Sequence, residues 1–167
     1  MSSKKMSSFE IRASLFLASV YGLRMLGMFL ILPIFAIYAS GLSGNPTQLQ
    51  IGLALGIYGL TQAVFQIPFG MSSDFFGRKK VIYFGLALFV LGSIIAGSSS
   101  QIENIIIGRA IQGAGAISAV LTALLSDLTR DEHRTKAMAI VGGSIGLTFA
   151  LSLVISPWLN DKIGVSG

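Results

Sequence analysis

Two arginines stand inside long apolar runs, where a charged side chain is unusual. Arg24 lies in YGLRMLGMFLILP, and Arg109 lies in IIIGRAIQGAGA. An arginine near the centre of a lipid bilayer costs at least about 2.5–3.5 kcal/mol on insertion scales, so such a residue is a candidate for function. Gln112 follows Arg109 by three residues and therefore projects from nearly the same helix face. Because glycines surround Arg109 and thin the helix there, we expect a water-accessible cavity beside it.

Each intramembrane polar residue also has a structural interpretation. Arg24 can donate to a backbone carbonyl beside a helix break at Pro33, or it can line a substrate cavity, and the sequence leaves both open. For Arg109 the cavity is the favoured interpretation. Gln62 and Gln66 are four residues apart in YGLTQAVFQIPFG, which suits either the lining of a cavity or hydrogen bonds between helices.

The stretch GMSSDFFGRKK, residues 70–80, places an acid, a glycine and three cations between two apolar runs. Asp74 and Asp127 both end apolar runs, where the macrodipole of a helix disfavours an anion by about 0.3–1 kcal/mol. Gly77 permits a tight turn, so Arg78 can fold back to Asp74 and, if the second and fourth runs are neighbours, also reach Asp127. We therefore expect these three charges to form one cluster, with an ordinary solvated loop as the alternative.

The composition indicates that the chain is surrounded by lipid rather than by water. Of the 167 residues, 53% are hydrophobic and 11% are charged, whereas a soluble domain has about 25% charged residues. The chain has no cysteine and one histidine, His133, so we expect neither a metal site nor a cofactor. The net charge of +5 does not indicate nucleic acid, because the cations cluster between apolar runs. No nucleophile–base pair or phosphate-binding loop is visible, so an enzyme is not expected.

Five apolar runs divide the chain, each near or above the roughly 20 residues that a helix needs to cross the hydrocarbon core. They cover roughly 13–38, 49–72, 81–99, 102–127 and 135–158. None alternates strictly as a barrel strand does. The first is too long for the core of a signal peptide, and we expect it to be retained. The sequence therefore predicts an all-α, polytopic bundle in the lipid bilayer, with residues 1–167 forming one partial transmembrane domain.

The cations also predict an orientation. Lysines and arginines precede the first run and fall between the second and third and between the fourth and fifth. The alternate loops, ASGLSGNPTQ and SSSQIEN, contain neither residue type. The positive-inside rule then places the N-terminus and residues 73–80 and 128–134 in the cytoplasm of a multi-pass membrane protein.

Several motifs, in order along the chain, resemble those of the major facilitator superfamily. GMSSDFFGRKK is similar to the superfamily's signature loop between helices two and three. The matching positions are Gly70, Asp74, Gly77, Arg78 and Lys79, while Phe75 stands where an arginine is usual. RAIQGAGAIS is similar to the fourth-helix motif, and SDLTRDEHRTKAMAI matches at Asp127 and Arg134. The fifth-helix antiporter motif departs: SLVISPWLND keeps only Pro157, with Ser152 and Ser156 at glycine positions.

The resemblance implies a fold of twelve helices in two six-helix halves, of which this sequence supplies the first five. A longer protein or a partner chain would supply the missing half. It implies proton-coupled efflux of small molecules across the inner membrane by alternating access. In that scheme Asp74 meets the cytoplasmic N-terminus of a helix in the second half and latches the outward-facing state, while Arg78 and Asp127 tune its charge. The rival hypothesis is a non-transporting multispan scaffold or assembly subunit.

Overall fold

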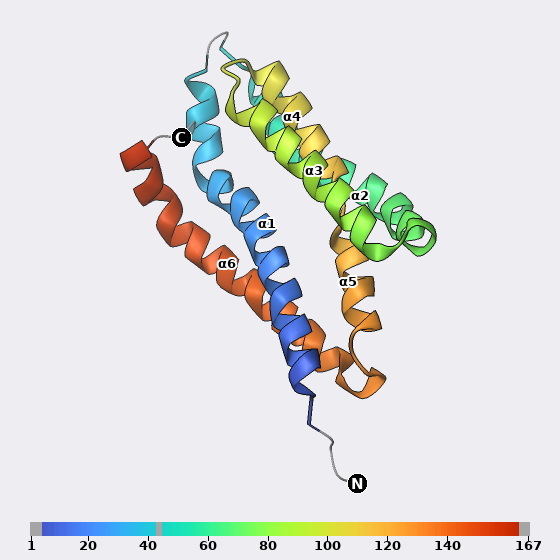
Figure 1. Cartoon of the computed structure of the whole chain (residues 1–167). Helices are drawn as coiled ribbons and strands as arrows, with labels where there is room; N and C mark the ends of the chain where they lie inside the picture. Colours follow the sequence, from blue (N-terminus) through green and yellow to red (C-terminus); the bar gives the residue numbers. More distant parts are fainter. Residues whose placement is uncertain (1–4, 43–44, 164–167) are drawn as a thin grey trace.

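The computed structural model describes residues 5–42 and 45–163, and every regular element in these residues is helical (Figure 1). The long elements are α1 (Ser8–Ser40), α2 (Gln48–Phe76), α3 (Arg78–Gly97), α4 (Ile102–Ala114), α5 (Ser118–Asp127) and α6 (Arg134–Ile163). A short 3-10 turn, η1 (Asp131–His133), joins the last two helices. The all-α fold class is thereby confirmed.

Local sequence signals set where the first two helices begin. The hydroxyl of Ser7 accepts the backbone N–H of Glu10, and the Glu10 carboxylate accepts the backbone N–H of Ser7. Thr47 and Gln50 form the same reciprocal pair at the start of α2. Such a capping box satisfies backbone donors that the first turn of a helix leaves free. The expected break at Pro33 is wrong, because α1 continues through it to Ser40.

The helices form two groups that meet along a shared core (Figure 1). In one group, α1 and α6 run side by side; in the other, α4 packs against both α2 and α3. One apolar cluster joins the groups through α1, α2, α3, α5 and α6; its buried members include Leu17, Phe69, Ile82, Leu121 and Val141. A second cluster joins α1, α2 and α4 and includes Phe35, Ile51 and Ile105.

The fourth span is present at the expected residues, but it is not one continuous helix. The α4 helix ends at Ala114, residues 115–117 are non-helical, and α5 starts at Ser118. In the interruption, Ala116 N–H donates to the Ala114 carbonyl at 2.8 Å and Ile117 N–H donates to the Gly115 carbonyl at 2.9 Å. These tight turns end the i→i+4 pattern and expose carbonyl groups to side chains of other helices.

The α3 and α4 helices approach so closely that their backbones touch at a glycine. A Cβ atom added at Gly92 would lie 2.4 Å from the backbone nitrogen of Gln112 and 2.5 Å from the carbonyl oxygen of Gly108. Close contact through small residues is the usual way in which membrane helices pack, because lipid supplies no hydrophobic drive for association. The crossing therefore fixes the position of Gln112 relative to α3.

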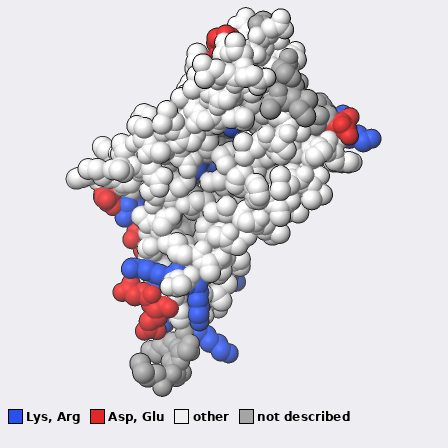
Figure 2. All heavy atoms as spheres, turned by 180° about the vertical axis from the view of Figure 1, so that it is seen from behind, with Lys and Arg blue, Asp and Glu red and all other residues white. Residues whose placement is uncertain are grey.

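Five helical segments are long and apolar enough to cross a membrane: Ser8–Phe35, Gln48–Phe76, Arg78–Gly97, Ile102–Asp127 and Asp131–Trp158. Many large apolar side chains on them face outward, among them Leu49 at 82% exposure and Val154 at 76%. Figure 2 shows the charged residues gathered toward the helix ends, with a broad uncharged middle in which only small blue patches are visible. This distribution is that of a bundle solvated by lipid.

Candidate functional site

Arg78 joins the ends of three helices. Its guanidinium lies 2.6 Å from an Asp74 carboxylate oxygen near the end of α2 and 3.1 Å from an Asp127 oxygen at the end of α5. It also donates to the hydroxyl of Ser73 at 2.5 Å. Gly77 has φ +91° and ψ 140°, a conformation nearly confined to glycine, and this turn starts α3 at Arg78. We call Ser73, Asp74, Arg78 and Asp127 the Arg78 cluster.

The Arg78 cluster is partly open to solvent. The side chains of Asp74 and Asp127 are 60% and 53% exposed, while that of Arg78 is 24% exposed. Ser73 is buried and its hydroxyl donates a hydrogen bond to the Gly70 carbonyl at 2.6 Å, which joins the cluster to the α2 backbone. Lys79 is exposed and forms no ion pair with any described residue. The cluster is therefore a solvent-reachable charge junction on a fixed turn.

A second charge junction lies at the start of α1, and the sequence interpretation missed it. Glu10 is only 4% exposed in its side chain and accepts Arg130 Nε at 3.0 Å, Nη2 at 2.8 Å and the Arg130 backbone N–H at 3.0 Å. The hydrogen bond to Glu10 raises the pKa of the Arg130 guanidinium above its ordinary value. Two bonds from one guanidinium fix its orientation. The signal that could have found Glu10 is SSFE, a capping-box pattern before an apolar run.

Arg24 supports the interruption in the fourth span. It is 3% exposed, and its terminal nitrogens donate to the Gly115 carbonyl at 3.1 Å and to the Ser118 hydroxyl at 3.0 Å. It thus satisfies a backbone carbonyl beside a helix break, but the break is at 115–117 rather than at Pro33. Its Nη2 also lies 3.4 Å from the Gln62 side-chain oxygen, which makes Gln62 part of an interhelical contact. Gln66 is exposed, and no hydrogen bond joins its side chain to a described residue.

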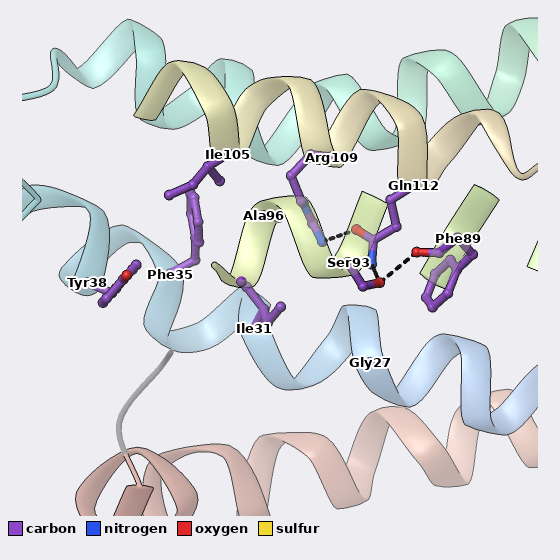
Figure 3. A pocket seen from close by; sticks show the side chains of 11 residues that line it. Gly27, Ile31, Phe35, Tyr38, Phe89, Ser93, Ala96, Ile105, Arg109 and Gln112 are labelled. Carbon is purple, nitrogen blue, oxygen red and sulfur yellow. Dashed lines mark hydrogen bonds between the residues drawn. The ribbon is translucent and has the colours of Figure 1, made fainter. Parts of the chain in front are cut away.

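Arg109 lies on a cavity between α1, α3 and α4 (Figure 3). The residue is 2% exposed, and the cavity measures about 200 Å³. Arg109 Nη1 donates to the Gln112 side-chain oxygen at 2.9 Å, and Gln112 Nε2 donates to the Ser93 hydroxyl at 2.9 Å. Ser93 in turn donates to the Phe89 carbonyl at 2.7 Å. Figure 3 shows this chain of donors leading away from the arginine along one wall of the cavity.

The ring of Tyr58 contacts both arginines, and the sequence interpretation did not single out this residue. The guanidinium carbons of Arg24 and Arg109 lie 6.0 and 5.2 Å from the centre of its ring. A cation over an aromatic face at this range is attracted by the ring quadrupole. Nothing in the pattern of YGLTQAVFQIPFG distinguishes a buried tyrosine that receives cations from one that only fills the core.

Ser152 and Ser156, which are buried in the fifth span, have structural partners. Ser152 donates to the Thr148 carbonyl at 2.7 Å, and Ser156 donates to the Leu30 carbonyl of α1. Arg134 pairs with Asp131 at 2.9 Å. His133 is 2% exposed, and neither of its ring nitrogens has a hydrogen-bond partner in residues 5–42 and 45–163. In the same residues, no group of three or more His, Cys, Asp or Glu side chains is placed to hold a metal ion.

The arrangement contains two kinds of site. The Arg78 cluster and the Glu10–Arg130 pair join helix ends and can strengthen or weaken the contacts between helices as charges change. The Arg109 cavity offers a cation and hydrogen-bond donors within the apolar part of the bundle and can hold a small polar ligand there. No described residue offers an activated nucleophile beside a base.

Comparison with known proteins connects these sites to a family. A family model described as Major Facilitator Superfamily matches residues 17–167. The inner membrane transport protein YajR of Escherichia coli is 54% identical over 165 residues, which are 99% of this chain and 36% of that protein. An uncharacterized transporter of Buchnera aphidicola from Schizaphis graminum is 50% identical over 98% of this chain and 42% of its own length. The tetracycline resistance protein of class H from Pasteurella multocida is 31% identical over 83% of this chain and 34% of its own length. The chain thus spans less than half the length of these relatives.

Proposed function

The chain belongs to the major facilitator superfamily, and from that membership we propose that it is part of a transporter that exports small molecules in exchange for protons. The superfamily consists of membrane transporters rather than enzymes. Its members move small molecules across a membrane, and related folds do so by rocking one bundle of helices against another. The proposal adds direction, coupling ion and mechanism to this family assignment.

The observation that carries the proposal is the Arg78 cluster. Arg78 reaches a carboxylate on α2 and another on α5, and both acids stay more than half exposed. Exposed ion pairs stabilise a fold by only about 0–1 kcal/mol each. A junction of this kind is weak enough to be broken and remade during a transport cycle. We assign to Asp74 the role of a latch that holds the outward-facing state against the rest of the transporter, with Arg78 and Asp127 tuning its charge.

Export is the direction that the relatives' names support. One relative is named for resistance to tetracycline and another, from Bacillus subtilis, is a multidrug resistance protein that is 38% identical over 57% of this chain. A membrane transporter protects a cell from a drug by moving it outward. The seven acidic residues of the chain all lie at or beyond the ends of its spans, so a proton that acts within this chain acts there. Protonation of Asp74 would weaken the latch and so couple the cycle to pH.

The orientation is part of the same proposal. The N-terminus, residues 73–80 and residues 128–134 face the cytoplasm of a multi-pass protein in the inner membrane. The cation-free loops near residues 45 and 100 face the opposite side. Arg109 and Gln112, with Arg24 and Gln62 behind them, belong to the substrate pathway.

Transport into proteoliposomes with an imposed pH gradient tests the proposal. The protein expressed from its whole reading frame is reconstituted, and uptake of a panel of small carboxylates, neutral amides and amines is measured. We expect uptake of at least one class that collapses when a protonophore removes the gradient, and uptake by Asp74→Asn reduced about tenfold or more while the amount of folded protein is unchanged. Flux that ignores the protonophore would refute proton coupling. No flux of any class would favour the scaffold hypothesis instead.

A further inference from the structure

The cavity between α1, α3 and α4 is mostly apolar, with one polar stretch of wall that carries a cation. Phe35 and Ile31 of α1, Phe89 of α3 and Ile105 of α4 supply apolar surface, while Arg109 and Gln112 supply the polar stretch between Ile105 and Phe89 (Figure 3). Its volume of about 200 Å³ is smaller than the roughly 300–1,000 Å³ of pockets that hold drug-sized ligands. The shape and lining therefore suit a small molecule with an apolar body and one polar group.

The Arg109 guanidinium has no counterion in the described part of the chain. Arg109 donates to the neutral Gln112 oxygen at 2.9 Å and, weakly, to the Ala54 carbonyl at 3.5 Å. Neither Arg109 nor Arg24 forms an ion pair with any residue in 5–42 and 45–163. Buried charges in proteins are ordinarily paired, because burial removes the hydration that stabilises them. Two buried guanidiniums near one ring thus create a positive site without its anion.

Unpartnered polar atoms point to the same deficit. Arg24 Nε and the Tyr58 hydroxyl are both buried, and neither has a hydrogen-bond partner among the described residues. The Tyr58 ring lies within about 6 Å of both guanidinium carbons. Buried polar atoms without a partner are rare in folded proteins. Neither Arg24 nor Tyr58 lines the cavity, so these atoms do not contact a ligand there, but they show that the polar groups beside it are incompletely paired.

The hydrogen bonds along the cavity wall bring no negatively charged group to Arg109. The Gln112 side-chain oxygen accepts from Arg109, and the Gln112 amide nitrogen donates to the Ser93 hydroxyl. The Ser93 hydroxyl in turn donates to the Phe89 carbonyl. Every group in this series of hydrogen bonds therefore donates away from Arg109. No hydrogen bond joins the Nη2 group of Arg109 to a described residue, and Arg109 is one of the residues that line the cavity.

We propose that this cavity binds a small organic anion, a carboxylate with an apolar body about the size of benzoate, with Arg109 as its charge partner. Arg24 is a second cation nearby, because its guanidinium carbon lies 5.6 Å from the centre of the Phe89 ring that lines the cavity. The proposal rests on the proposed transport function, because it names the substrate class of that transporter. The carboxylate accepts from Arg109, and the apolar body lies against Phe35, Ile31 and Ile105. Charge-assisted bonds of this kind are shorter and stronger than those between neutral groups.

Three molecules of nearly equal shape test the charge preference: benzoate, benzamide and benzamidine are anionic, neutral and cationic. Binding to the purified protein, expressed from its whole reading frame, is measured by calorimetry without a membrane gradient. We expect benzoate to bind about tenfold or more tightly than benzamide, as a hydrogen bond to a charged group predicts, and benzamidine not to bind. Equal binding of the three, or no binding of benzoate, overturns the proposal.

Two variants locate the site. Arg109→Gln should remove the preference for benzoate over benzamide. Because this variant removes a buried hydrogen bond and can misfold, Gly27→Leu provides a second test that leaves the arginine in place. A Cβ atom at Gly27 meets only Phe89 at 3.8 Å, so Gly27→Ala should fold and bind, whereas the leucine side chain should fill the cavity and abolish binding. Gly52→Leu is the matched control, because no atom lies within 4 Å of its Cβ position on α2.

The result separates this proposal from the transport function. Benzoate binding that survives Gly27→Leu places the anion elsewhere and overturns the site. A protein that binds benzoate with the expected dependence on Arg109, but moves no substrate in proteoliposomes, retains the site and loses the transport proposal. A protein that transports only cations or neutral compounds and ignores benzoate retains the transport proposal and loses the anion site.

Discussion

Replacing Arg78 should cost more stability than replacing either acid that it contacts. Arg78→Gln breaks two partly exposed ion pairs, each worth about 0.2–1 kcal/mol, and the hydrogen bond to the Ser73 hydroxyl, worth about 0.5–1.5 kcal/mol, so we expect a loss of about 1–3 kcal/mol. Asp127→Asn breaks one such pair but also removes an anion from the C-terminal end of α5, where the macrodipole opposes it by about 0.3–1 kcal/mol. These contributions offset, so the net change for Asp127→Asn should stay within about 0.5 kcal/mol.

Thermal unfolding of the purified protein in detergent measures this asymmetry. A loss of 1 kcal/mol lowers the midpoint by about 2–4 °C for a domain of this size, so the two variants are distinguishable. In the double variant, the cost of Arg78→Gln should fall, because one of its two partners is already neutral. If Asp127→Asn alone destabilised the protein as much as Arg78→Gln does, the cluster would be a structural element of the fold, and its proposed role as a weak, switchable latch would be wrong.

Three further measurements follow from the packing and the charges. Gly92→Ala should destabilise the protein by about 1–3 kcal/mol, because its Cβ meets the backbone of α4 at 2.4 Å, while Gly52→Ala, with open space around it, should gain about 0.5–1 kcal/mol in the same thermal assay. Lys79→Cys should resist an impermeant thiol reagent on intact cells and Ser100→Cys should react, and the reverse labelling would invert the orientation. Glu10→Gln should lower hydrogen-exchange protection across residues 128–133, and unchanged protection would mean that Arg130 does not hold this turn.

The fold class was predictable because lipid imposes simple rules. An apolar run of about 20 residues in a bilayer has to be helical, because only a helix satisfies all its backbone groups within one segment. Chain order does not give the packing partners, since α1 packs mainly against α6 rather than α2. The Arg78 cluster could be anticipated for a similar reason. Each acid at a helix C-terminus favours a cation, and Gly77 supplies a turn that few other residues can adopt. The fold class and the Asp74–Arg78 pair depend on local chemistry that one chain segment carries by itself, whereas the contact with Asp127 also required the ends of the second and fourth spans to be neighbours.

The interruption of the fourth span was not predictable in the same way. GAGAIS reads as a continuation of an apolar helix, since glycine and alanine are common inside membrane helices. The break depends on tertiary partners: Arg24 donates to the Gly115 carbonyl, and Ile117 fits against α3 only because position 85 is a glycine. A Cβ at Gly85 would lie 2.2 Å from the Ile117 side chain. Such pairings join distant segments and leave no periodic signal.

The sequence raised the same two roles for both intramembrane arginines, a structural contact or the lining of a cavity, and the structure places the two residues differently. Arg24 spends its terminal nitrogens on the backbone and side chains around residues 115–118, so its position is fixed by the break that it supports. Arg109 has one strong partner, Gln112, and the rest of its guanidinium is at a cavity. Arg24, whose terminal nitrogens both donate to groups at the break, stabilises a local shape, whereas Arg109 lines the cavity and carries the proposed anion site. The guanidinium carbons of Arg24 and Arg109 lie 6.0 and 5.2 Å from the centre of the Tyr58 ring, so one side chain contacts both the residue at the break and the residue at the cavity.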